Sequence, residues 1–209
     1  MMKRVLSGLL FTVVISGGAA MAVEEPPYSA SRQERAFEVR DYPALVAAEV
    51  TVGGERREAA NAGFRLLAAY IFGGNTRSQS IAMTAPVVQA PAGESIAMTA
   101  PVIQSSDAGG WIIRFIMPRG YTLDTLPVPK DPKVRLLALP PSRFAVVRFS
   151  GLAHAQDIEE KTAELRTYMQ TNHLRAASVP LLARYNPPWT LWFMRRNEVM
   201  IPLQAEIPG

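Results

Sequence analysis

The chain has 209 residues, of which 48% are hydrophobic and 19% charged, and its formal net charge is +4. This composition is that of an ordinary globular protein, and the length suits one domain. The chain has no cysteine, which excludes disulfide bonds, thiolate metal sites and cysteine nucleophiles. Acidic and basic residues are interspersed without a basic stripe, so nucleic acid is not an expected partner.

Residues 1–22 have the three-part pattern of a secretory signal peptide. A positive start at Lys3 and Arg4 precedes a mostly apolar run at residues 5–15, and small residues then lead to a cleavage site ending at Ala22. The apolar run is too short for a bilayer core, which needs ~20 residues. We therefore expect a periplasmic or secreted mature protein, with no stable membrane insertion after cleavage.

The expected mature chain begins with a loose segment, two strands and the clearest helix. Residues 23–35 are rich in charge and proline and are expected to be flexible. Residues 37–40 alternate apolar and polar side chains, and residues 44–52 form a second predicted strand that ends at a glycine pair. Residues 55–72 repeat apolar side chains at helical spacing, and the glycines that follow end this helix.

The predicted helix has a second, partly apolar face. Its members recur at the same helical spacing: Arg57, Asn61, Phe64, Ala68 and Ile71. Two apolar faces on one helix indicate either deep burial or a ligand lying against the second face.

A short segment of the sequence occurs twice. SIAMTAPVVQ at residues 80–89 recurs as SIAMTAPVIQ at residues 95–104, after a linker with proline and glycine. This arrangement predicts a hairpin. Pro86 and Pro101 cannot donate to a strand ladder, so each is expected at an edge or a bulge.

The second half repeats the order of the first. Predicted strands at residues 134–139 and 143–149 flank a proline pair, and a helix follows at residues 156–171. Residues 179–185 and 198–203 are expected to be closing strands. Two like units predict one pseudo-twofold α+β domain, with two helices packed on a curved antiparallel sheet.

The sequence offers few groups for catalysis or metal binding. His154 and His173 are expected at opposite ends of the second helix, more than ~25 Å apart at 1.5 Å per residue, and cannot share one metal ion. Neither a zinc-protease motif, a serine nucleophile elbow nor a phosphate loop is present. The acidic residues of that helix are expected to form a solvated face. We predict no catalytic residue and no metal site.

Aromatic residues crowd the C-terminal turn. Tyr185, Trp189, Trp192 and Phe193 lie in or next to a proline-rich segment. Large rings near the spare apolar face of the first helix could form the wall of a ligand pocket, whereas single methionines in the predicted strands are explained by core packing.

Several segments, in this order, resemble the SOUL heme-binding protein family. They are FEVRDY at residues 37–42, GF at 63–64, YI at 70–71, GN at 74–75, IAMTAPV at 81–87, YNPP at 185–188 and RNE at 196–198. The resemblance extends from about residue 36 to residue 203, and the chain looks like a bacterial, exported member. It implies two βαββ-type repeats that form a distorted antiparallel β-barrel flanked by two helices, within one domain at residues 36–205.

The resemblance also implies non-covalent binding of heme or a related tetrapyrrole in an apolar groove beside the first helix and the C-terminal turn. The candidates for this groove are Arg57, Asn61, Phe64, Arg65, Ala68, Tyr185 and Trp189. Of these candidates, Phe64, Ala68, Tyr185 and Trp189 would cover the porphyrin face. Arg57 or Arg65 would pair with the porphyrin propionates. Some family members have a histidine proposed as an iron ligand at the position of Asp41, so no axial histidine is expected here.

Binding through shape and apolar contact suits a non-catalytic carrier or buffer. Two other hypotheses remain open at this point: an effector-binding module for other apolar or cationic small molecules, similar to the ligand domains of multidrug-sensing regulators, and a hydrolase on the same fold. A carboxylate inside the groove would favour either of these, because it would hold a cation or act as a base. A groove without ionisable groups inside it, rimmed by arginine, would favour tetrapyrrole. The fold alone does not choose among them.

Overall fold

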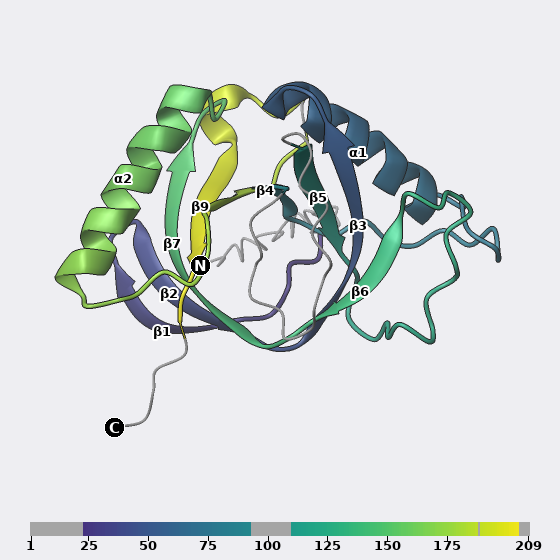
Figure 1. The fold of residues 1–209 in the computed structure, drawn as a ribbon, viewed down its shortest axis with the longest axis horizontal. Coiled ribbons are helices and arrows are strands. Elements are labelled where there is room, and N and C mark those ends of the chain that lie inside the picture. The colour runs from purple at the N-terminus through teal and green to yellow at the C-terminus, as the bar shows by residue number, and fades with distance from the viewer. Residues whose placement is uncertain (1–22, 93–109, 188, 205–209) are drawn as a thin grey trace, which may run out of the picture.

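The computed structural model describes residues 23–92, 110–187 and 189–204. Nine antiparallel strands form one sheet that curls into an open half-barrel, and two long helices lie on its convex side (Figure 1). The strands are β1 (Ser29–Glu34), β2 (Phe37–Tyr42), β3 (Leu45–Gly53), β4 (Val87–Pro91), β5 (Gly110–Ile116), β6 (Arg135–Leu139), β7 (Ser142–Ser150), β8 (Leu181–Arg184) and β9 (Arg196–Pro202). The helices are α1 (Arg56–Ile71), α2 (Ala155–Thr171) and the short 3-10 helix η1 (Trp192–Met194). Neither long helix is a candidate for crossing a bilayer.

The strands follow the order β1-β2-β7-β9-β8-β4-β5-β3-β6. On either side of the β8–β4 pair the same plan recurs, because β2, β7 and β9 on one side take the places of β6, β3 and β5 on the other. Strands β2 and β3 precede α1 in the chain, and β6 and β7 precede α2. In the sheet β2 pairs with β7 and β6 pairs with β3, so the first strand of each set lies beside the second strand of the other. This order is compatible with the pseudo-twofold repeat, which stays a prediction. The sheet ends at β1 and β6, so the expected barrel is a half-barrel.

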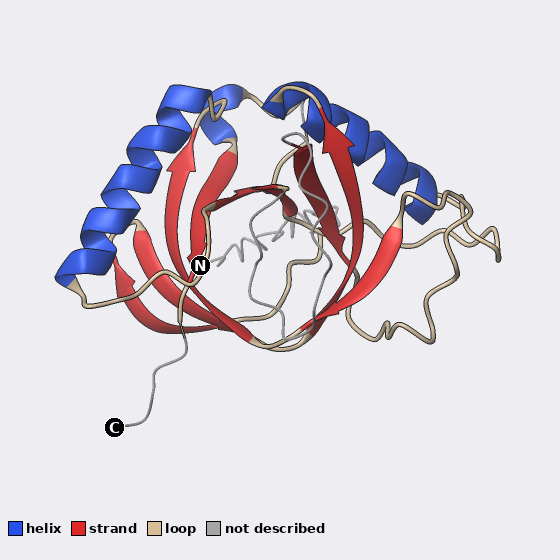
Figure 2. Cartoon of the chain, in the orientation of Figure 1, coloured by secondary structure: helices blue, strands red, loops and turns tan. Residues whose placement is uncertain are grey.

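Alternation along the strands divides the sheet into a convex and a concave face. Val39, Val147 and Val199 pack with α2, whereas Val50, Ile113 and Phe115 pack with α1. Both helices therefore cover the convex face (Figure 2). A third apolar cluster, which includes Tyr42, Leu181 and Met200, belongs to the concave face, opposite α1 and α2.

Helix α1 agrees closely with its predicted range, and its core stripe is confirmed at Ala59, Gly63, Leu67 and Tyr70. Gly63 allows the closest approach to the sheet, since a Cβ there would lie 2.4 Å from Cγ1 of Ile113. Part of the second face is buried too. Ile71 is 1% exposed, and the ring of Phe64 packs edge-on against Phe115 at 5.3 Å between centroids.

Residues 23–35 were expected to be a flexible segment, but part of this segment forms a strand. Residues 29–34 form strand β1, which pairs with β2 along its length. Glu25 accepts two hydrogen bonds from Arg196 Nη1, both at 3.0 Å. All six side chains of β1 are exposed. An edge strand held by backbone hydrogen bonds needs no apolar side chains, so its composition gave no strand signal.

The repeated segment is described only in its first copy. Strand β4 begins at Val87, directly after Pro86, and lies between β8 and β5 in the sheet interior. Pro86 therefore precedes the ladder instead of marking an edge. The second copy at residues 95–104, with Pro101, lies outside the described residues, and so does the predicted hairpin between the copies.

Candidate functional site

A cavity with a volume of about 480 Å³ opens on the concave face of the half-barrel. It lies where several strands begin or end, at the ends of β2, β5, β6 and β9 and the starts of β3, β4, β7 and β8. Apolar side chains dominate its wall, among them Leu45, Val88, Ile116, Leu139, Phe144, Leu181 and Met200. Both long helices lie on the convex side, so neither of them contributes to this wall.

Three ionised side chains also line this concave cavity: Asp41, Arg114 and Arg143. Asp41 accepts a hydrogen bond from Nε of Arg143 at 2.7 Å, and both side chains are about one-third exposed. Arg114 donates from Nε to Glu49 at 2.6 Å on the neighbouring strand. Each of these charges therefore has an opposite charge within hydrogen-bond distance.

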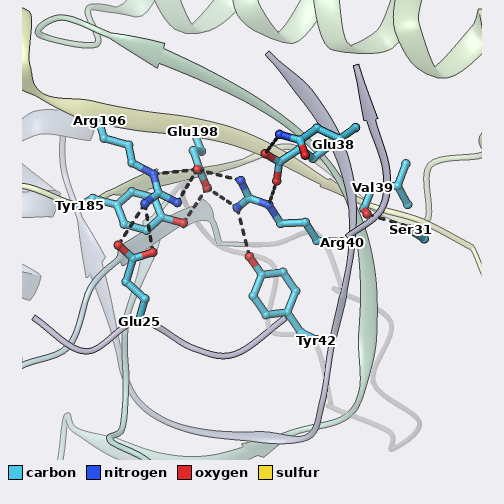
Figure 3. Close-up of polar contacts among 10 residues, drawn as sticks. Glu25, Ser31, Glu38, Val39, Arg40, Tyr42, Tyr185, Arg196 and Glu198 are labelled. Atoms are coloured by element: carbon cyan, nitrogen blue, oxygen red, sulfur yellow. Dashed lines mark hydrogen bonds and ion pairs between the residues drawn. The ribbon is translucent and has the colours of Figure 1, made fainter. Parts of the chain in front are cut away.

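A buried ionic network lies beside the concave cavity (Figure 3). Both oxygens of Glu198 accept hydrogen bonds from the two Nη atoms of Arg40, at 2.8 and 3.0 Å. The hydroxyl of Tyr185 donates to Oε2 of Glu198 at 2.6 Å, and Nε of Arg196 donates to Oε1 at 3.0 Å. Tyr42, which lines the cavity, links the network to it through Nη1 of Arg40 at 3.3 Å.

The network fixes the protonation states of its members. Burial alone would raise the pKa of Glu198, but hydrogen bonds from Arg40 outweigh it and hold the pKa below its usual value. Burial and the charge of Glu198 raise the pKa of Tyr185. Glu198 therefore stays an anion whose oxygens are already occupied, while Tyr185 stays a neutral donor.

The candidates predicted on the first helix form an outer face of α1. Arg57, Asn61 and Arg65 are exposed, and Phe64 and Ala68 are half-buried. Phe64 packs against Phe115 in the core beneath the helix. None of these five residues lines the concave cavity, or either of two smaller cavities of about 390 and 210 Å³.

The two candidates from the C-terminal turn are separated from that face. Tyr185 packs with the concave-face cluster and lies under the guanidinium of Arg196, 3.7 Å from its ring centre. Trp189 is 83% exposed. The seven predicted residues thus occupy three different surroundings, and the structure gathers them into no common cavity.

Two smaller cavities also lie on the described part of the chain. One of about 390 Å³ lies between the helices, with Arg56 of α1, Trp111 of β5 and Glu159 of α2 in its wall. The other, about 210 Å³, adjoins the concave cavity and shares Pro26 and Leu45 with it. Among the described residues no three His, Asp or Glu side chains are grouped as a metal site would require.

The ionic residues of the concave face were missed by reasoning from the sequence. Arg40 and Glu198 lie within two segments that carry the family resemblance, but neither was given a role. The alternation in residues 37–42 places charged side chains on one face of the strand, which is typical of a solvent-facing surface. Only the curvature of the sheet turns that face inward, and one strand's sequence does not reveal curvature.

The fold is shared with several solved structures of low sequence identity. The EcmrR C-terminal domain aligns with a TM-score of 0.55 and 9% identity, covering 85% of this chain and 98% of that domain. An uncharacterized conserved protein from Listeria innocua aligns at 0.56 with 14% identity, covering 82% of this chain and 93% of the other. A hydrolase from Listeria innocua aligns at 0.55 with 14% identity, covering 83% and 94%.

These similarities establish the fold and no activity, since different functions occur on one fold. Among curated proteins no match was found. The family comparison is more specific, because the model for the SOUL heme-binding protein matches residues 23–202. That match extends over nearly all of the half-barrel and both helices, and the chain therefore belongs to the SOUL heme-binding protein family.

Proposed function

We propose that the protein is a non-catalytic binder of heme or a related tetrapyrrole, acting as a carrier or buffer, and that the concave cavity is its binding site. The observation that carries this proposal is the cavity on the concave face, whose wall is mostly apolar and includes no residue of either long helix. Its volume of about 480 Å³ lies within the roughly 300–1,000 Å³ typical of ligand pockets. Membership of the family supplies the class of ligand.

The residues of the concave cavity fit a tetrapyrrole. Leu139, Phe144 and Met200 offer apolar and aromatic contacts to a flat macrocycle. Arg143 lies at the same cavity, is about one-third exposed, and is paired with a carboxylate that is equally accessible to water. A propionate would compete with Asp41 for this guanidinium and form a charge-assisted hydrogen bond. Bound heme would supply a metal centre, but the protein's contribution here is shape, apolar contact and charge.

Cation binding or hydrolysis would need a carboxylate in the groove, and Asp41 does line the concave cavity. The carboxylates that the structure describes on this face are, however, already paired with arginines. Asp41 is paired with Arg143, Glu49 with Arg114, and Glu198 with Arg40. A cationic ligand would have to displace an arginine, and a general base would need a raised pKa where that of Glu198 is lowered. We therefore favour tetrapyrrole over cation binding or hydrolysis.

The test is a titration with hemin followed at the Soret band, repeated with metal-free protoporphyrin IX followed by fluorescence. Because apolar contact dominates, we expect both ligands to saturate the protein, with dissociation constants within about tenfold of each other. Saturation by neither ligand would show that tetrapyrrole binding is wrong.

Two matched variants locate the site. Ser142 and Ser150 are the two ends of β7, but only Ser142 lines the cavity. We expect Ser142→Trp to fill the cavity and weaken binding by more than about tenfold, while Ser150→Trp leaves it unchanged. If Ser142→Trp binds normally and the charge reversal Arg57→Glu/Arg65→Glu does not, then the ligand lies on the outer face of α1, as the sequence predicts, and the cavity is not the site.

The proposal places this activity outside the cytoplasm. Its support is the signal-peptide pattern of residues 1–22, together with a family match that begins at residue 23. Intact mass measurement of the protein recovered from the periplasm or the medium tests it. The expected mature chain begins at Val23, and recovery only of uncleaved protein in the cytoplasm would contradict export.

A further inference from the structure

The loop between β8 and β9 exposes an unusual concentration of large apolar side chains. Eleven large hydrophobic residues of the described chain are exposed, and five of them lie within residues 189–194. Their exposed fractions are 83% for Trp189, 58% for Leu191, 61% for Trp192, 55% for Phe193 and 63% for Met194. We name residues 189–194 the apolar tip. Exposed apolar patches of this kind mark surfaces that contact something other than water.

The apolar tip is a compact turn whose backbone is hydrogen-bonded internally. Met194 N donates to Leu191 O at 2.9 Å, and Nε of Arg195 donates to Thr190 O at 2.8 Å. At its base, Arg196 N donates to Oδ1 of Asn186 at 2.6 Å. With backbone groups bonded inside the turn, the apolar side chains project outward. The rings of Trp192 and Phe193 meet edge-on, 5.7 Å apart.

Arginines lie next to the base of this turn. Nη1 of Arg184 donates to Oε1 of Gln89 at 3.3 Å, and Nε2 of Gln89 donates to the backbone oxygen of Arg56 at 2.8 Å. Burial lowers the pKa of Arg184, and the positive charges of Arg56 and Arg195 lower it further. Arg184 precedes the apolar tip and Arg195 directly follows it, so positive charge lies at the base of the turn, where it attracts anions.

The shape of the apolar tip selects among occupants. No residue from 189 to 194 lines the concave cavity or the two smaller cavities described above, so the tip does not form a wall of these pockets. A stable protein interface uses roughly 20–30 residues on each side, far more than this turn. Tryptophan beside arginine is the composition that favours a membrane–water interface, where rings enter the lipid boundary and cations meet phosphate.

We propose that the apolar tip docks the protein on an anionic lipid surface, with Trp189, Trp192 and Phe193 entering the headgroup boundary. Arg184 and Arg195, which are half-buried at the base of the turn, add positive charge that favours an anionic surface. The attachment is peripheral and reversible, because it involves a single short turn. This inference does not rest on the proposed tetrapyrrole site, since the concave cavity and the tip share no residue.

The test is co-sedimentation with two kinds of vesicle, phosphatidylcholine alone and phosphatidylcholine with about one quarter phosphatidylglycerol. The full chain is expressed, and the protein that the host releases is purified in the same way for every variant. We expect binding to the anionic vesicles, a blue shift of tryptophan emission, and loss of most binding at about 1 M salt, where the screening length is about 3 Å. No binding to anionic vesicles at low salt would overturn the proposal.

Variants separate the apolar from the ionic contribution. We expect Trp192→Ser/Phe193→Ser to lower vesicle partitioning at least about tenfold, and Arg184→Gln to weaken binding only to anionic vesicles. The control, Val128→Ser/Leu152→Ser, removes side chains 62% and 47% exposed elsewhere and should bind normally. Equal vesicle binding by Trp192→Ser/Phe193→Ser and its control would contradict membrane docking.

Two further measurements identify the other occupants. A dimer in sedimentation velocity that disappears in Trp192→Ser/Phe193→Ser would show that a second copy covers the tip. Weaker hemin binding in the same variant would show that the ligand does. Either result would overturn membrane docking, whereas failure of hemin binding in every variant would leave the vesicle result standing.

Discussion

Arg40 on β2 and Glu198 on β9 meet through two parallel hydrogen bonds of 2.8 and 3.0 Å, although 158 residues separate them in the sequence. Strand β7 lies between β2 and β9, so the two side chains join above its concave surface. Their side chains are 1% and 0% exposed. A buried pair of this geometry ties the two halves of the chain together, and each partner is costly to leave alone.

Removing both members of this pair should cost less stability than the sum of the losses from removing each one alone. Glu198→Leu leaves the guanidinium of Arg40 buried without its main partner, and we expect a loss of about 3–5 kcal/mol in the free energy of unfolding. Arg40→Met/Glu198→Leu should lose less than the sum of the two single variants. Urea unfolding of all three measures the coupling, and strict additivity would show that the pair contributes little.

The same carboxylate makes stability depend on acid. The pKa of Glu198 in the folded protein is lowered from its usual 4.5. Its contribution is therefore present above pH 4.5 and is lost as the pH falls through the lower, folded value. We expect the free energy of unfolding to fall more steeply below this pH in the unmodified protein than in Glu198→Gln. Parallel acid limbs for the two proteins would contradict the assignment.

Alkaline pH should act through a different residue. Burial raises the pKa of Tyr70 from 10.0 to about 12, and its hydroxyl donates to Pro127 O at 2.9 Å. Since the unfolded chain ionises first, this stabilisation is present below pH 10 and is lost as the pH rises toward 12. We expect Tyr70→Phe to cost about 1 kcal/mol at neutral pH and to flatten the alkaline limb. An unchanged limb would mean that another group titrates there.

Local patterns predicted those parts of the fold that local forces decide. Helix α1 was expected at residues 55–72 and spans Arg56–Ile71, because apolar spacing and terminal glycines act within one segment. Helix α2 was likewise confirmed, with Ile158, Leu165, Tyr168 and Met169 buried. Strand β1 has no apolar side to bury, so its sequence resembled a flexible end.

The candidate site was less accessible to such reasoning because its parts come together only through the curl of the sheet. Phe64 and Trp189 belong to separate surroundings, one against Phe115 and one at an exposed turn. The concave cavity combines residues from Pro26 to Leu203. No spacing along the chain encodes that meeting, although the family resemblance named the correct class of protein.

Close packing of α1 against the sheet offers a sharp test of the fold. Alanine favours a helix over glycine by about 1 kcal/mol. At Gly63, however, a Cβ would lie 2.4 Å from Cγ1 and 2.8 Å from Cβ of Ile113. We expect Gly63→Ala to destabilise by about 1–3 kcal/mol, because the helix must move outward. Gly53→Ala is the control, since no atom lies within 4 Å of its added Cβ. Thermal unfolding compares them, and a stabilised Gly63→Ala would contradict this packing.

Substitution of Phe64 tests whether this residue belongs to the core or contacts the ligand. Its ring packs on Phe115 and on the cluster beneath α1, so Phe64→Ala should lower the free energy of unfolding by about 3 kcal/mol. Once corrected for the unfolded fraction, its affinity for hemin should equal that of the unmodified protein, because Phe64 does not line the concave cavity. Urea unfolding and the Soret titration are measured on the same sample. If Phe64→Ala keeps its stability but no longer binds hemin, then Phe64 contacts the ligand and the binding site lies on the second face of α1.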